Sequence, residues 1–205
     1  MAETGFNAVQ LGDTIPGTDS SGGLVNASLL GTIKRFDNLA LTAGDSVKAL
    51  RSHGPVWGVL LRNLSGGALL GKRLALCKQT AGYSIIEAAS GYGAALYDAP
   101  VVAIDPWLPT AGVANNDIFI GVFYGPTILM APSSGSDILA TAAVGTPLVC
   151  SDDNNGRITP AAPASDSAVY NAANAVFGRS LYAFSSAATD QEIAVYMHCP
   201  WFPTG

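Results

Sequence analysis

The sequence is poor in charged side chains. Asp, Glu, Lys and Arg make up 12 % of its 205 residues, about half of their usual share in a soluble globular domain. The 10 basic residues form no group larger than the pairs Lys34-Arg35 and Lys72-Arg73. With 15 acidic residues, the net charge is −5. Nucleic-acid binding depends on clustered Lys and Arg that neutralise phosphates, so we expect no contact with DNA or RNA.

The residues from which catalytic sites are usually built are also scarce. Only two histidines occur, His53 and His198, and no GxSxG segment that would present a nucleophilic serine accompanies them. Glu occurs three times, and no spacing of carboxylates singles out a pair for glycoside hydrolysis. The run 66–73 lacks both the spacing and the Ser or Thr of a phosphate-binding loop. We therefore predict that the protein is not an enzyme and carries no cofactor.

Cysteine occurs three times, at Cys77, Cys150 and Cys199, without a CxxC pair. This pattern is typical of buried free thiols in a protein made in a reducing compartment. A zinc site made of His198 with Cys77 and Cys150 is conceivable but has no supporting spacing. The polar run 151–156 places a glycine at the sixth position of an EF-hand loop, but the twelfth position is Ala162, where a bidentate Glu is needed. We predict no metal site.

Long apolar runs are missing as well. No run reaches the ~18 residues of a transmembrane helix, and the first residues lack the basic and apolar regions of a secretory signal. We therefore expect a protein that is made in the cytoplasm and has no membrane partner. The chain is instead rich in small residues and 49 % hydrophobic. So few charges do little to keep copies apart, which favours a place inside an assembly.

Short β-rich runs separated by Gly, Pro and Asn turns dominate from residue 46 on. Strands are predicted at 56–61, 74–78, 101–104, 118–124 and 128–130. Pro126 is expected to interrupt the last two, because proline donates no ladder hydrogen bond. Turns are predicted at 63–67 and 115–117. The pattern predicts an all-β protein, a β-sandwich or barrel with few short helices.

The last third of the chain predicts a small antiparallel β-module. Residues 148–150 form a strand, and the polar segment that follows ends in Asn155-Gly156, which tolerates the positive φ of a hairpin turn. Residues 157–159 begin the return strand, and β-rich runs follow at 176–184 and 192–197. A Ser-rich linker at 133–136 separates this module, residues 137–205, from a central β domain at 46–132. The segment 165–175 fits either a short helix or an ordered loop.

The first 45 residues are too rich in glycine for a core and too apolar for a solvated tail. Two interpretations stay open: an extended arm that lies on another subunit, or an edge strand and loop of the same domain. Residues 26–30 fit one helical turn capped by Asn26. The candidate contacts with a capsid or a partner subunit are apolar residues near the two chain ends: Phe6, Val9, Leu11, Ile15, Trp201 and Phe202.

The order of motifs in the last third resembles the head decoration (cement) proteins of tailed bacteriophages. That family has a recurring G-x-P-L-V segment, followed by N-G-R, G-R-A-L and a final strand. The matching residues are Gly145, Pro147, Leu148, Val149, Gly156, Arg157, Gly178, Arg179, Leu181 and the strand 193–197. The resemblance covers about the last 60 residues well, and the middle segment less specifically.

This resemblance implies a structural virion protein, made in the host cytoplasm, on the outer surface of a capsid. Such proteins commonly form homotrimers that clamp neighbouring capsomers of the major capsid protein. Two other functions stay open. A head-fibre or adhesin module that binds carbohydrate or a cell surface would expose Trp57, Trp107 or Trp201 in a groove, whereas packing anchors would be buried. A minor head-completion or tail component would be present in few copies per particle.

Overall fold

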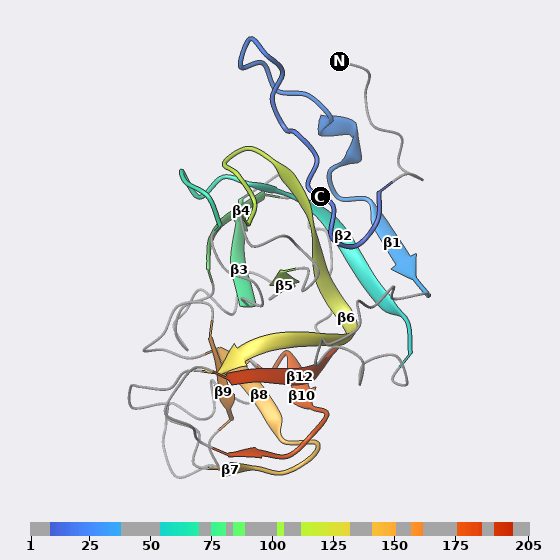
Figure 1. Cartoon of the computed structure of the whole chain (residues 1–205), viewed down its shortest axis with the longest axis vertical. Helices are drawn as coiled ribbons and strands as arrows, with labels where there is room; N and C mark the ends of the chain where they lie inside the picture. Colours follow the sequence, from blue (N-terminus) through green and yellow to red (C-terminus); the bar gives the residue numbers. More distant parts are fainter. Residues whose placement is uncertain are drawn as a thin grey trace.

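The computed structural model describes residues 9–37, 54–69, 75–80, 84–88, 102–104, 112–131, 141–150, 157–161, 176–185 and 191–198. Within these residues the chain forms twelve strands and a single 3-10 helix, η2 (Ala27–Leu29), as Figure 1 shows. The all-β class predicted from the sequence is therefore confirmed.

Ten of the strands form one sheet in the order β1-β2-β4-β3-β5-β6-β12-β10-β8-β9. Their bounds are β1 Ile33–Phe36, β2 Val56–Asn63, β3 Ala75–Thr80, β4 Ser84–Ala88, β5 Val102–Ile104, β6 Ile118–Ala131, β8 Pro147–Cys150, β9 Ile158–Pro160, β10 Gly178–Ser180 and β12 Gln191–His198. The short strands β7 (Thr141–Ala142) and β11 (Phe184–Ser185) pair with each other. Among the described strands, only β2 and β4 pair in parallel.

Five strands close into a ring. β2 pairs with β4, β4 with β3, β3 with β5, and β5 with β6, which pairs back with β2. Closure of this kind makes a small barrel and removes open strand edges. β1 lies outside the ring. It pairs with the first half of β2, with Ile33 beside Val59, whereas β4 pairs with the last two residues of β2.

β6 is the longest described strand and belongs to both parts of the sheet. Residues 118–124 pair with β2, whereas 124–131 pair with β12, and Figure 1 shows the strand bending between them. The bend falls at Gly125, whose φ is 101°. The prediction that Pro126 interrupts the strand is wrong. Beyond Tyr124, β6 has a described partner strand on one edge only, and such an edge tolerates a residue without an N–H.

The described part of the N-terminal segment packs on its own chain. Ile15 and Ile118 exchange two backbone hydrogen bonds of 2.9 Å, and β1 adds to β2. Most of the described buried apolar residues form one cluster, which extends from Val9 in this segment to Met197 in β12. The barrel and the C-terminal strands therefore share a core. Residues 1–8 and 38–45 of the proposed arm, and the predicted linker at 133–136, lie outside the described part of the chain.

Asn26 does not cap the helical turn as predicted. It precedes η2 in the left-handed region, with φ 57°, and makes no side-chain capping bond. Its Nδ2 donates instead to the Pro16 carbonyl at 2.9 Å. The side chain therefore ties this turn to the preceding loop.

The predicted C-terminal hairpin is confirmed. β8 and β9 pair antiparallel with Cys150 beside Ile158, and the connecting residues 151–156 lie outside the described part. The predicted turn at 115–117 is present, with Asn116 at a φ of 72°. In the turn at 63–67, the Asn63 Nδ2 donates to the Gly67 carbonyl at 2.8 Å. The segment 165–175, His53 and Trp107 are among the residues not described.

Candidate functional site

β12 has one buried face and one face toward solvent. Its buried side chains, Ile193, Val195 and Met197, belong to the core cluster. The other face carries Glu192, Ala194, Tyr196 and His198, all exposed or half-buried. Strict alternation of this kind is typical of an antiparallel strand that covers a core on one side only. The outer face of β12 is therefore part of the molecular surface.

β6 adds one exposed residue to this surface. The register places Ile128 opposite Ala194, where Ile128 is buried, and Tyr124 opposite His198. Residues directly opposite each other in an antiparallel pair have neighbouring side chains on the same face. Tyr124 is 42 % exposed, so the bend in β6 leaves an aromatic ring at the surface.

β2 adds a second exposed aromatic ring beside Tyr124. Trp57 pairs with Tyr124, and the register then shifts, so that Gly58 pairs with Val122 and Phe123 is skipped. A bulge of this kind redirects side chains next to it. Trp57 is the one clearly exposed residue of β2, at 36 %. Three strands thus bring Trp57, Tyr124 and Tyr196 together.

Tyr124 and Tyr196 hold each other in place. Their ring centroids are 5.5 Å apart and their planes meet at 80°, a T-shaped contact. The hydrogen bond between their side chains, with burial as a smaller cause, raises the pKa of Tyr196 to about 12. Tyr196 therefore stays neutral at physiological pH. Two rings fixed by both contacts lose little freedom when they bind a ligand.

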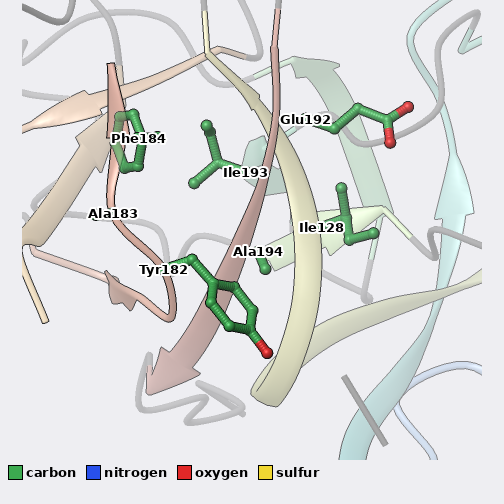
Figure 2. Close-up of a pocket in the computed structure, with 7 residues that line it drawn as sticks. All are labelled: Ile128, Tyr182, Ala183, Phe184, Glu192, Ile193 and Ala194. Atoms are coloured by element: carbon green, nitrogen blue, oxygen red, sulfur yellow. The ribbon is translucent and has the colours of Figure 1, made fainter. Parts of the chain in front are cut away.

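A hollow of about 160 Å³ lies toward the other end of β12 (Figure 2). Its lining residues are Ile128, Tyr182, Ala183, Phe184, Glu192, Ile193 and Ala194. The segment after β10 borders it, because the Leu181 N–H donates to the Ala194 carbonyl at 2.9 Å. Figure 2 shows the Tyr182 ring beside Ala194, and this residue is 43 % exposed.

These four aromatic residues, Trp57, Tyr124, Tyr196 and Tyr182, are called the aromatic strip below. Ala194, which neighbours Tyr182, lies two residues before Tyr196 on the same face of β12, a separation of about 7 Å along a strand. The strip therefore runs from Trp57, near the start of β2, to the hollow beside Tyr182. Of its residues, the sequence pattern singled out only Trp57.

The residues that carry the phage-head resemblance meet where β8, β10 and β12 pair side by side, and Tyr196 belongs both to this unit and to the aromatic strip. Gly178 pairs with Leu148 on one side and with Met197 on the other. The Arg179 guanidinium donates to the Gly145 carbonyl at 3.0 Å, and Arg179 also pairs with Pro147. Motif residues far apart in the sequence therefore form one contacting unit.

Two glycines of this unit have structural reasons to be glycine. Gly145 has a φ of 80°, where residues with a Cβ are strained. A Cβ on Gly178 would lie 2.8 Å from the Val195 Cγ1 and 2.9 Å from the Tyr196 carbonyl oxygen. These motif residues shape the fold and supply no reactive group.

Three of the apolar residues proposed as capsid or subunit contacts, Val9, Leu11 and Ile15, belong to the described part of the chain. Val9 and Ile15 are 2 % and 4 % exposed in the core of their own chain, and Leu11 packs against the same cluster. In this structure Val9 and Ile15 offer almost no surface to another molecule. Phe6, Trp201 and Phe202 lie outside the described residues.

Arg62 is a buried cation that the sequence pattern did not single out. It is 3 % exposed, and its NH2 group donates to the Val25 carbonyl at 3.0 Å. Its Nε has no hydrogen-bond partner, and burial lowers the pKa of Arg62. Among the described residues no carboxylate pairs with it. Arg62 fastens the N-terminal segment to β2, a structural role.

The described part of the chain has neither a metal-binding cluster nor a membrane-spanning helix. No group of three or more His, Cys, Asp or Glu side chains is placed to hold a metal ion there. No described helix has the length and apolar character needed to cross a membrane. Cys77 lies in β3 and Cys150 in β8, and Cys199 lies outside the described residues.

Comparisons with known proteins give no relatives. No protein-family model, no curated protein and no solved structure matches this chain. Function is therefore inferred from the residues and from their geometry.

Proposed function

We propose that the protein is a structural component of a phage virion. It binds the outer surface of the capsid as a homotrimer, joins neighbouring capsomers of the major capsid protein, and performs no catalysis. The main support is that motif residues resembling those of cement proteins and far apart in the sequence form one contacting unit. It joins Gly145, Pro147, Leu148, Gly178 and Arg179 with the end of β12. A resemblance concentrated in residues that this packing requires favours a shared module.

A shared module alone does not determine function, so the surface must also fit. A net charge of −5 suits the outer face of a shell better than a face toward DNA. A trimer that contacts several capsomers at once gains ~10²–10⁴ in avidity without a single strong contact. Such a protein needs an inert scaffold and little else, which agrees with the scarcity of reactive residues.

Binding to capsids tests this proposal directly. Purified protein is mixed with expanded, emptied capsids, the bound copies are counted by quantitative gel densitometry, and the free protein is sized by sedimentation. We expect a trimer that saturates the capsid at a fixed ratio and raises its disruption temperature. A protein that stays monomeric and leaves capsids bare refutes the proposal, and a few copies per particle indicate a minor component.

A further inference from the structure

We propose that the aromatic strip binds a neutral carbohydrate chain. Carbohydrate binding goes beyond capsid binding and does not depend on it, because it uses the exposed aromatic side chains of the strip, whereas the capsid proposal rests on the pairing of β8, β10 and β12. Tyr196 belongs to both. The size of the strip, its charge and its mixture of polar and apolar groups support the proposal.

The exposed area of the strip fits a chain of small rings better than a protein. Trp57, Tyr124 and Tyr182 are 36 %, 42 % and 43 % exposed. An aromatic side chain offers roughly 150–250 Å², so these three present roughly 200–300 Å² together. A stable protein interface needs about 800 Å² from each partner. The strip is too small to hold a protein subunit alone, and it reaches the lower end of the ~300–600 Å² of functional patches on monomers.

The charges around the strip argue against a phosphate-bearing ligand. Single-stranded nucleic acids also stack on aromatic rows, but they need a groove of basic residues beside the rings. Two described basic residues border the rings. Arg35 pairs with Trp57 across the β1–β2 ladder and is bridged to Asp37 at 2.7 Å. Arg179 pairs with Tyr196 across the β10–β12 ladder and donates to the Gly145 carbonyl at 3.0 Å. With Asp37 and Glu192 also present, the described surface around the strip has no surplus of basic charge. Glu192 lines the hollow at the other end, and the chain is acidic overall. The ligand is therefore uncharged.

The polar groups of the strip argue against a purely apolar ligand. The tyrosine hydroxyls, the indole N–H of Trp57 and the imidazole of His198 lie on the same surface as the rings. Covering these groups with hydrocarbon would remove their water without replacing its hydrogen bonds. A sugar ring has apolar C–H faces and hydroxyls at its edges, so it covers a flat ring and satisfies the polar groups beside it.

The hollow gives the ligand a defined end. Its volume of about 160 Å³ holds about five waters at ~30 Å³ each, which suits one sugar ring or a branch. Tyr182 lines the hollow, and its ring lies beside Ala194 (Figure 2). A chain that stacks on Trp57 and contacts the T-shaped pair of Tyr124 and Tyr196 would place its terminal unit at the hollow.

The test begins with a neutral glycan array, followed by titration calorimetry with cellohexaose, maltohexaose and chitohexaose. We expect binding to at least one neutral chain. Trp57→Ala and Tyr182→Ala each weaken it about two- to tenfold, the range for loss of one aromatic contact. Leu24→Ala is the matched control, because Leu24 is an exposed apolar residue, at 66 %, in the N-terminal segment, where it pairs with Thr18. This control leaves the affinity unchanged.

Several results would overturn the proposal. One is the absence of binding to every glycan of the array. Another is that strip variants bind as tightly as the parent protein. A third is tighter binding to a heparin hexasaccharide or an oligonucleotide than to the neutral chains. Circular dichroism confirms that each variant is folded, and Tyr182→Ala is informative even where Trp57→Ala is unstable, because Tyr182 lies in a segment outside the barrel. Capsid binding by the same variants is measured separately, so failure of one function does not obscure the other.

Discussion

Replacing Gly125 with alanine tests whether β6 bends as the structure shows. A Cβ at this position would lie 2.3 Å from the Pro55 carbonyl oxygen and 3.0 Å from the Val56 Cα. Both are backbone atoms, so neither moves aside as the end of a side chain does. The φ of 101° adds backbone strain for any residue with a Cβ. Gly125→Ala should therefore destabilise the protein in two ways, by a steric clash with the backbone of residues 55–56 and by backbone strain.

Alanine variants at two other glycines separate the cost of the clash from the cost of the strain. Gly67 has no positive φ and has open space where a methyl group would stand, so Gly67→Ala should change stability by no more than about 0.5 kcal/mol. Gly66 has open space but a φ of 84°, so its alanine variant should lose about 1–2 kcal/mol from strain alone. Gly125→Ala adds about 1–3 kcal/mol of overpacking, which gives a loss of about 2–5 kcal/mol.

Urea unfolding followed by tryptophan fluorescence measures all three variants under the same conditions. The expected order of midpoints is parent protein and Gly67→Ala, then Gly66→Ala, then Gly125→Ala. Equal slopes show that the changes lie in the stability of the folded state. If Gly125→Ala unfolds at the same midpoint as Gly66→Ala, the close approach of Pro55 to the bend does not exist and the path of β6 is different.

Three further predictions use the same reasoning. Gly178→Ala should cost about 1–3 kcal/mol in urea unfolding, because its methyl group meets the Val195 side chain and the Tyr196 carbonyl; an unchanged midpoint would contradict the packing of β10 on β12. Ser180→Ala should lower the free energy of unfolding by about 1–3 kcal/mol, since the buried hydroxyl donates to the Ala143 carbonyl at 2.7 Å. Thr127→Val should be neutral or stabilising, because the buried Thr127 hydroxyl has no hydrogen-bond partner. Equal losses of stability in the two variants would refute this contrast. The raised pKa of Tyr196, about 12, should appear as one late step in a spectrophotometric tyrosine titration. Its folded pKa lies above the unfolded value of ~10. The contribution of the protonated Tyr196 to folding stability is therefore present below pH ~10 and is lost as the pH rises toward 12. Tyr124→Phe should move the late step to lower pH, and an unmoved step would exclude the hydrogen bond between the two tyrosines.

The strands of the barrel could be predicted largely from local pattern, but its closure could not. The apolar, β-branched runs at 56–61 and 118–124 are strong signals, and both became strands. Nothing in either run specifies that Leu60 lies beside Ile120. β1 was missed because Lys34 and Arg35 break its apolar character, although it needs only one buried residue, Phe36, on the core side.

The candidate site was harder to predict than the fold, for a related reason. Tyr124 and Tyr196 each belong to a strand whose composition indicates burial, and only the register of β6 with β12 makes them neighbours. The alternation of 192–198 did contain a usable signal, because it places Tyr196 on the face of Glu192. The exposure of Trp57 depends on the register shift at Gly58, which has no local signature.

β12 links the two proposed functions. It pairs edge to edge with β10 of the motif unit, its buried face belongs to the core, and its outer face carries Tyr196 of the strip. A slip of one residue in its pairing with β6 would exchange the two faces, and the bend at Gly125 sits at the point where this pairing begins. Gly125→Ala should therefore weaken capsid and carbohydrate binding together, whereas Trp57→Ala should weaken carbohydrate binding alone. If Gly125→Ala removed only one of them while the protein stayed folded, the two surfaces would not depend on a common register.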